Sequence, residues 1–353
     1  MTDLFFPAEW HKQDAILLTW PHQESDWREH LADVESVYLD ILGQLSHSQD
    51  ILIQLHPTID FDSLSKRFEQ EGINQARCHL IPLISSDTWA RDHGPITVLK
   101  AGEPCLYDFT FNGWGGKFNA ELDNALNRGM VEKGIFDAPM ESIDWVMEGG
   151  SVESDGAGTL MTTRQCLLNA NRNGPATEAD VAQRLKQWFG VEQIIWLESG
   201  ALQGDDTDAH IDTLARFAPN QRLVYQSCDD AQDPHYNALQ QMESELQQAR
   251  TLTGEAYELI ALPWPDAQFN VAGERLPATY ANFLICNQVV LAPCYGVRQD
   301  ESALTALGRA FPEHRVIGID CRALIEQFGS LHCITMQLPE GTVNRRWLDR
   351  DEA

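Results

Sequence analysis

Short apolar runs rich in β-branched residues recur along the whole chain. Between them lie longer segments in which apolar residues return every three or four positions, as Leu31, Val34 and Tyr38 do. The first pattern predicts strands and the second predicts amphipathic helices. We expect strands at 15–20, 50–55, 79–83, 95–99, 105–111, 159–163, 193–197, 222–226, 258–262, 283–292, 315–319 and 331–338. Helices are expected near 27–46, 61–71, 120–136, 177–189, 236–251 and 300–310.

Strands and helices interleaved in this way predict an α/β protein. Strand pairs alternate with single helices, which favours a repeated ββαβ unit over a doubly wound sheet. Thr177 and Asp180 stand three residues apart at the start of the fourth helix and predict a capping box. Because the chain shows no low-complexity linker and no shift in composition, we expect one domain over residues 1–353.

Charge narrows the choice of partner. Against 53 acidic residues there are 25 lysines and arginines, and the formal net charge is −28. This balance argues against nucleic acid and anionic membranes, which require a basic face. It suits a small cationic substrate, although solubility alone also explains an acidic surface.

The start of the chain and its cysteines indicate a compartment. The first residues lack the basic region of a signal peptide, and no apolar run is long enough to span a bilayer. The eight cysteines form no CxxC pair, which disfavours a structural zinc site or a disulfide framework. We therefore expect a cytoplasmic protein with reduced thiols.

Four loops carry residues suited to cleaving a carbon–nitrogen bond of a guanidinium group. Cys333 offers a nucleophile, His210 a proton carrier, and Asp92, Glu148 and Asp212 offer carboxylates that match a planar cation. We expect a turn to hold Asp92 at a strand end, and the glycines after Glu148 to allow a ligand close to the backbone. Each residue alone could also be structural, as a core histidine, an inert thiol or a salt-bridge partner.

His210 and Asp212 stand two residues apart, so on a strand they would share one face. His332 would then point away from its neighbour Cys333, which makes His210 the preferred proton carrier. A zinc site is a weaker interpretation, because the spacings are long and the carboxylates suit an organic cation. We expect no metal and no cofactor, since no phosphate-binding glycine loop occurs either.

The spacing of these loops is nearly regular. Asp92 and Glu148 are 56 residues apart, Glu148 and His210 are 62 apart, and His210 and Cys333 are 123 apart. A structural repeat of about 60 residues would present one such loop per repeat, with one repeat skipped.

Short segments along nearly the whole chain resemble the agmatine deiminase family, also called the Porphyromonas-type peptidyl-arginine deiminase family, of the guanidino-modifying pentein superfamily. They are 7–10 (PAEW), 19–21 (TWP), 89–95 (WARDHGP), 111–117 (FNGWGGK), 148–150 (EGG), 206–212 (DTDAHID), 277–283 (PATYANF) and 332–335 (HCIT). The resemblance implies a five-bladed α/β propeller of pseudo-fivefold ββαβ modules around a central pocket.

The resemblance also implies roles for the candidate residues. Cys333 would be the nucleophile and His210 the general acid and base. Asp92 and Asp212 would hold the guanidinium, and Glu148 would assist that grip or orient His210. The implied reaction is hydrolysis of agmatine to N-carbamoylputrescine and ammonia, a step of putrescine biosynthesis.

Some implications remain open at the level of the sequence. Trp89 and Trp114 would line the substrate pocket or serve as core aromatics. The substrate could instead be peptidyl arginine or free arginine, the reaction could be amidino transfer, or the protein could bind a guanidine without catalysis. A homodimer is expected by analogy with the family alone.

The sequence departs from the family pattern at two places. Ala209 stands where the family usually has glycine before the histidine. Residues 328–331 (FGSL) replace the usual glycine-rich run before His332 and Cys333. The reacting groups are retained in both cases, but the departures leave loop flexibility and substrate choice open.

Overall fold

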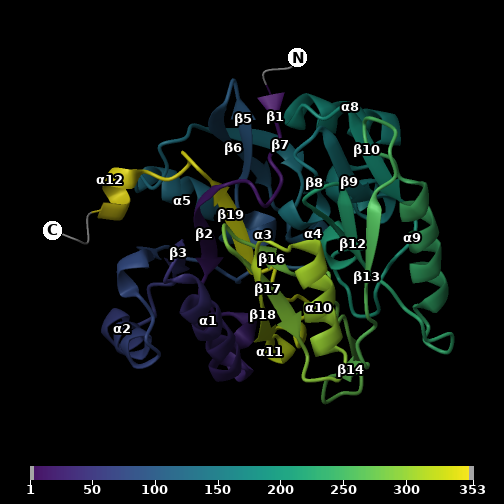
Figure 1. The fold of residues 1–353 in the computed structure, drawn as a ribbon. Coiled ribbons are helices and arrows are strands. Elements are labelled where there is room, and N and C mark those ends of the chain that lie inside the picture. Colours follow the sequence, from purple (N-terminus) through teal and green to yellow (C-terminus); the bar gives the residue numbers. More distant parts are fainter. Residues whose placement is uncertain (1–3, 350–353) are drawn as a thin grey trace. The chain divides into compact units, whose positions relative to one another are not determined.

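The computed structural model describes residues 4–349, and Figure 1 shows the order of the elements. The chain divides into two compact units. Unit 1 contains the described residues up to His11 together with Gly150–His332, and unit 2 contains Lys12–Gly149 together with the segment from Cys333 onward. The chain therefore passes between the units after His11, after Gly149 and after His332. A single domain over 1–353 stays a prediction.

Unit 2 contains two sheets. In the first, the central parallel strands are almost wholly buried, as expected for strands covered on both faces. Its order is β19 (Thr335–Pro339), β2 (Gln13–Thr19), β3 (Asp50–Leu55) and β4 (Cys78–Pro82), with β19 antiparallel to β2 and the others parallel. In the second, β5 (Ile96–Lys100) pairs antiparallel with β6 (Glu103–Thr110), and β6 pairs parallel with β7 (Met140–Val146). Helices of unit 2 are α1 (Leu31–Leu45), α2 (Phe61–Gln70) and α5 (Leu126–Glu132).

Unit 1 contains three sheets that share one pattern, an antiparallel pair followed by a parallel third strand. They are β8 (Glu153–Ser154), β9 (Thr159–Thr163) and β10 (Gln193–Leu197); β11 (Ala215–Ala218), β12 (Arg222–Gln226) and β13 (Glu258–Leu262); and β16 (Leu284–Ile285), β17 (Val289–Cys294) and β18 (Arg315–Asp320). The helices that precede the third strands are α8 (Glu178–Phe189), α9 (Tyr236–Gln248) and α10 (Asp300–Ala310). Helix α10 packs against both β13 and β18 (Figure 1).

The remaining elements are short. They are β1 (Leu4–Phe5), α3 (Ala90–His93), α4 (Gly113–Gly116), α6 (Arg164–Leu167), α7 (Ala170–Asn173), β14 (Gln268–Phe269), β15 (Arg275–Leu276), α11 (Arg322–Ile325) and α12 (Arg345–Leu348), with 3-10 turns η1 (Asp26–Glu29), η2 (Gln75–Arg77), η3 (Asp123–Ala125), η4 (Gly149–Ser151) and η5 (Ile211–Thr213). Among the described residues, no helix combines the length and the apolar character needed to cross a membrane.

The predicted α/β class is confirmed, and several elements match their predicted bounds, including β3, β9 and α10. The capping box also forms: the side chain of Thr177 accepts from the backbone of Asp180, whose own side chain accepts from the backbone of Thr177. Two strand predictions were wrong in extent. The run 283–292 is a hairpin of two strands, and β19 begins at Thr335 because residues 331–334 form a turn.

Candidate functional site

The predicted site residues are all buried and are divided between the two units. Unit 1 supplies His210 and Asp212. The members from unit 2 are Asp92, Glu148, Cys333, Trp89 and Trp114. Each is no more than 6% exposed. Burial of a polar group costs free energy unless the group has a hydrogen-bond partner or binds a ligand. Clustered buried groups of this kind are typical of functional sites.

In unit 2, an aromatic group holds Asp92. The indole N–H of Trp114 donates to Oδ2 of Asp92 at 2.9 Å, and Trp89 meets Trp114 edge to face with ring centroids 6.4 Å apart. Trp114 has the left-handed backbone angle φ 55°, which the side chain of Asn112 supports by accepting from the amide of Gly115. Asp92 was expected at the end of a strand, held there by a turn. In the structure it lies on the short helix α3, which precedes β5. Trp114 therefore orients a carboxylate rather than only filling space.

The loops of Glu148 and Cys333 are tied together through Arg91, within unit 2. The backbone N–H of Arg91 donates to the carbonyl of Cys333 at 3.1 Å. Gly149, which follows Glu148, lies so close to Arg91 that an added Cβ would stand 2.2 Å from its carbonyl oxygen. Gly149 is therefore required because the backbone of Arg91 approaches it closely. A ligand, not another segment of the chain, was expected from the sequence at this short distance. Asp92, Glu148 and Cys333 are thus held by one set of backbone contacts.

In unit 1, a strained loop carries His210. Asp208 and Ala209 have φ angles of 67° and 63°, a region that favours glycine. Hydrogen bonds hold the conformation: Asp205 accepts from the amide of Ala209 at 2.6 Å, and Thr207 accepts from the amide of His210 at 3.2 Å. The φ of Ala209 gives a physical reason for the family's usual glycine at this place.

The prediction that His210 and Asp212 share a strand was wrong. Ile211–Thr213 form the 3-10 turn η5, and strand β11 begins only at Ala215. The turn is fixed because Ile211 and Leu214 are fully buried in the apolar core of unit 1. His210 and Asp212 are thus presented by a turn anchored on either side.

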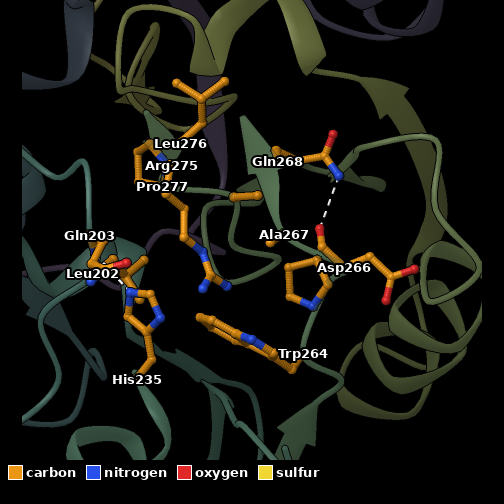
Figure 2. A pocket seen from close by; sticks show the side chains of 12 residues that line it. Leu202, Gln203, His235, Trp264, Asp266, Ala267, Gln268, Arg275, Leu276 and Pro277 are labelled. Atoms are coloured by element: carbon orange, nitrogen blue, oxygen red, sulfur yellow. Dashed lines mark hydrogen bonds between the residues drawn. The ribbon is translucent and has the colours of Figure 1, made fainter. Parts of the chain in front are cut away.

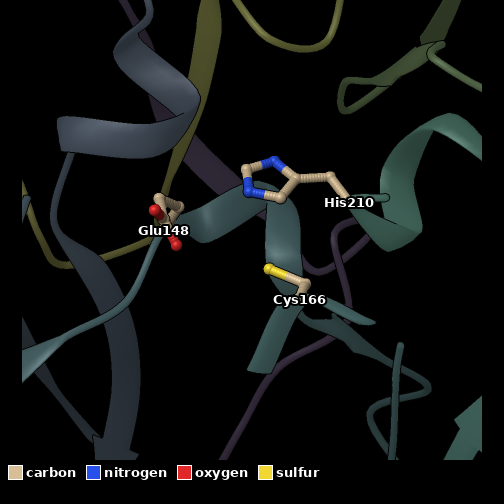
Figure 3. Close-up of side chains that lie close together, drawn as sticks. All are labelled: Glu148, Cys166 and His210. Atoms are coloured by element: carbon tan, nitrogen blue, oxygen red, sulfur yellow. The ribbon is translucent and has the colours of Figure 1, made fainter. Parts of the chain in front are cut away.

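A thiol lies beside His210 (Figure 3). Cys166 of α6 is fully buried, and its Sγ lies within 4.8 Å of a ring nitrogen of His210. No local pattern predicts this neighbour, because Cys166 stands 44 residues before His210. Among other cysteines, burial raises the pKa of Cys78 and of Cys294 to about 12, with nearby acidic groups adding to the effect. These two thiols are poor candidates for a thiolate nucleophile.

Unit 1 also contains a buried network of charged residues around Asp212. Nδ1 of His332 lies 2.7 Å from Oδ2 of Asp212, and Nε2 of His332 lies 2.7 Å from Oε2 of Glu9. Arg216 donates to the same Oε2 of Glu9 at 2.6 Å and to Glu153 at 2.8 Å. Burial by itself would lower the pKa of Arg216, but Glu153 and Glu9 raise it above the ordinary value. His332 thus contacts the carboxylates of Asp212 and Glu9, and it lies in the turn 331–334 where a strand was predicted.

Asp212 is ionised yet incompletely partnered. Burial would raise the pKa of its carboxyl, but the hydrogen bond and charge of His332 outweigh burial and hold that pKa below the usual value. Its Oδ1 atom is inaccessible to solvent and has no hydrogen-bond partner within the described residues. A buried polar atom without a partner is rare in folded proteins, so Oδ1 of Asp212 is a candidate acceptor for the N–H groups of a bound cation.

A small pocket elsewhere in unit 1 lies beside the β14–β15 hairpin and is lined in part by His235, Trp264 and Arg275 (Figure 2). All three side chains converge on Asp233, which accepts from Arg275 at 2.7 Å, from Trp264 at 2.9 Å and pairs with His235 at 2.7 Å. None of the predicted site residues lines this pocket. The cluster satisfies its own charges and supports the hairpin.

Comparison with known proteins gives a consistent result. The profile of the Porphyromonas-type peptidyl-arginine deiminase family matches residues 5–339. The chain belongs to this family.

Relatives of this deiminase family member cover nearly its full length. A protein of Marinomonas sp. (strain MWYL1), named "Putative agmatine deiminase", is 34% identical over 95% of this chain and 94% of its own. The structure of a cysteine-to-serine variant of C. jejuni agmatine deiminase with substrate bound is 36% identical, with a TM-score of 0.88 over 96% of this chain and 97% of that one. A structure named "Putative Arginine Deiminase" from Porphyromonas gingivalis is 42% identical, with a TM-score of 0.89 over 97% and 100%.

Sequence reasoning missed the buried network behind Asp212. Glu9 was noted only as part of the segment 7–10, and Arg216 was not singled out. Glu9 pairs with His332, which stands 323 residues away in the sequence, and no local pattern reveals such a contact. The available signal was the presence of Glu9 and His332 in two of the family-like segments.

Proposed function

We propose that this protein hydrolyses a guanidine, and that its substrate is agmatine, which gives N-carbamoylputrescine and ammonia. The observation that carries the proposal is the buried, ionised Asp212 whose Oδ1 has no donor among the described residues. A planar guanidinium presents N–H donors in the geometry that a carboxylate accepts. The agmatine deiminase from C. jejuni supports the reaction class through 36% identity over nearly the whole chain.

The proposed chemistry uses Cys333 as nucleophile. Its thiolate attacks the guanidinium carbon, and His210 gives a proton to the departing ammonia as the carbon–nitrogen bond breaks. An amidino-thioether remains on Cys333. His210 then takes a proton from water as the water oxygen attacks the same carbon, and the carbon–sulfur bond breaks to release the ureido product and the thiol. Cys333 belongs to unit 2 and His210 to unit 1.

Asp92, Asp212 and Glu148 are proposed to bind the cation during both steps. Asp92 is already oriented by Trp114, and Asp212 by His332. Trp89 and Trp114 are proposed to form an aromatic wall beside the guanidinium. No metal or cofactor is needed, since a protonated guanidinium already has an electrophilic carbon.

Agmatine is favoured over arginine by charge. Agmatine is a dication, whereas arginine has a net charge of +1, so the field of a chain with net charge −28 attracts agmatine more strongly. The relatives' names include both agmatine and arginine deiminases, so a substrate panel is the direct test. Ureido product should form from agmatine at a higher kcat/KM than from free arginine or arginine peptides. A preference for arginine peptides would refute the substrate assignment.

The nucleophile is tested with two cysteine variants. Cys333→Ser should abolish ammonia release while agmatine still binds, as measured by calorimetry. Cys294→Ser is the matched control and should retain turnover, because burial raises the pKa of Cys294 to about 12 and it is not placed in the reaction. Near-normal turnover by Cys333→Ser would contradict the mechanism. Addition of glycine or ornithine should leave the ureido yield unchanged, whereas an amidinotransferase would form a new guanidine.

We also propose that the repeated sheets close into a five-bladed propeller. Support comes from the order shared by the sheets of both units, in which an antiparallel pair is followed by a parallel third strand. The expected homodimer and the cytoplasmic location remain proposals of the same kind.

A further inference from the structure

We propose that His332 and Glu9 are positioning residues that fix the carboxylate of Asp212 for the substrate guanidinium. The inference deepens the proposed function and rests on it. Neither residue is assigned a part in the proposed chemistry, yet both are at least nine-tenths buried within unit 1.

The hydrogen bonds of His332 define its role. Each ring nitrogen lies 2.7 Å from a carboxylate oxygen, Nδ1 from Asp212 and Nε2 from Glu9. The ionised carboxylate of Asp212 can only accept, so the N–H of Nδ1 donates to its Oδ2. Such charge-assisted hydrogen bonds are roughly twice as strong as neutral ones. The contact therefore fixes which oxygen of Asp212 is occupied, Oδ2, and which remains for a ligand, Oδ1.

Glu9 cannot turn away from His332 without leaving other groups unpaired. Its Oε1 accepts from the amide of Ile285 at 2.7 Å, and its Oε2 also accepts from Arg216 at 2.6 Å. Arg216 is itself held by Glu153 and by the carbonyl of Phe283 at 2.7 Å. The far side of His332 is thus anchored in a fully buried ionic cluster.

The backbone on both sides of the contact is also fixed. The side-chain oxygen of Asn282 accepts from the amide of His332 at 2.9 Å, and its side-chain nitrogen donates to the carbonyl of Asp212 at 3.4 Å. With both main chains held, the remaining freedom at Asp212 is rotation of its side chain. The hydrogen bond from His332 removes that freedom.

The carboxylates of this cluster differ in what they leave for a ligand. Both oxygens of Glu9 and both oxygens of Glu153 accept hydrogen bonds from groups of the protein. Oδ1 of Asp212 has no such partner within the described residues. A single guanidinium at Oδ1 of Asp212 would supply the donor.

Two substitutions of His332 separate its two contacts. The amide nitrogen of asparagine occupies the place of Nδ1 and can donate to Asp212, whereas that of glutamine occupies the place of Nε2 and can donate to Glu9. Agmatine binding is measured by calorimetry in the Cys333→Ser background, and kcat and KM are measured without that change. His332→Asn should keep the Kd for agmatine within about 3-fold, and His332→Gln should raise Kd by about 10-fold or more, the scale of one hydrogen bond to a charged group.

A matched pair tests the role of Glu9. Glu9→Gln and Glu153→Gln each remove a carboxylate from Arg216, but only Glu9 contacts His332. Their unfolding temperatures should fall by similar amounts, while only Glu9→Gln should raise the Kd for agmatine, by about 3-fold, because it loosens the far side of the His332 ring and leaves the hydrogen bond to Asp212 in place. If a His332 variant does not fold, this comparison of Kd values still tests whether the contact between Glu9 and His332 positions Asp212.

The outcomes are distinct. Equal losses from His332→Asn and His332→Gln, or from Glu9→Gln and Glu153→Gln, would mean that the cluster serves folding alone and would overturn the inference. If the unsubstituted protein binds agmatine but does not turn it over, the proposed function fails while the Kd comparison still tests positioning. If it does not bind agmatine, both fail.

Discussion

Replacing Gly149 with alanine should damage catalysis by moving the segment that carries Cys333. The new Cβ would stand 2.2 Å from the carbonyl oxygen of Arg91 and 2.8 Å from Cε of Met336, whereas ordinary contacts begin at 3.4 Å. The methionine end can swing aside, but the carbonyl belongs to the backbone. Relief of the clash therefore requires a backbone shift of more than 1 Å. Because the N–H of Arg91 donates to the carbonyl of Cys333, that shift reaches the proposed nucleophile.

The magnitude follows from the size of the clash. Overpacking of a well-packed interior costs about 1–3 kcal/mol, and we expect about 3 kcal/mol because the obstructing atom is backbone. A displacement of about 1 Å in a reacting group can lower the rate roughly 100-fold. Gly149→Ala should thus lower kcat for agmatine by about 100-fold, with a smaller change in KM.

The assay is ureido formation from agmatine, with unfolding followed by circular dichroism. Gly43→Ala is the matched control in the same unit. It lies in α1 with nothing within 4 Å of an added Cβ, so it should leave kcat unchanged and add about 0.5–1 kcal/mol of stability. Wild-type kcat and stability in Gly149→Ala would refute the argument that this glycine is required by its contact with Arg91.

Two further substitutions test strain and acid sensitivity. Ala209→Gly should raise stability by about 0.5–1 kcal/mol, because a left-handed φ of 63° costs a non-glycine residue about 1–2 kcal/mol and glycine's greater chain entropy offsets part of that gain; an unchanged unfolding temperature would contradict this. Burial lowers the pKa of His93 to about 3, so below pH 6.5 the unfolded chain takes up a proton that folded His93 does not, and stability falls as pH drops from about 6.5 toward 3. At pH 5 the loss from this group is about 2 kcal/mol, and His93→Gln should remove it when urea unfolding at pH 7 and pH 5 is compared; an equal pH dependence in both proteins would count against the assignment.

Local pattern was sufficient for most elements of the fold. Strand β3 and helix α10 follow from runs in which the periodicity of apolar residues matches their backbone geometry. The strand prediction failed where residues are buried but do not have the backbone conformation of a strand. Leu331 and Ile334 are fully buried and read as part of a strand, yet they lie in a turn, since a hydrophobic residue reports that it is inside and not which φ and ψ it adopts.

The candidate site residues were predicted from the sequence for a different reason. Asp92, His210 and Cys333 stand in short segments whose residue types suit one chemistry. These segments also occur in the same order as the corresponding segments of the family. Their supporting contacts were not accessible. The hydrogen bond from Trp114 to Asp92 and the ion pairs of His332 depend on chain segments that meet only after folding, and a residue's type does not state its partner.

The pairing of Glu9 with His332 has a consequence for the biosynthesis of the protein. The partner of Glu9 is added to the chain 323 residues later. At a synthesis rate of about 5–20 residues per second, Glu9 waits roughly 15–65 s for it. During that interval the acidic cluster lacks His332 and the thiol of Cys333 does not yet exist. A nascent chain arrested before Cys333 therefore lacks the proposed reactive group as well as the partner of Glu9, and should be inert.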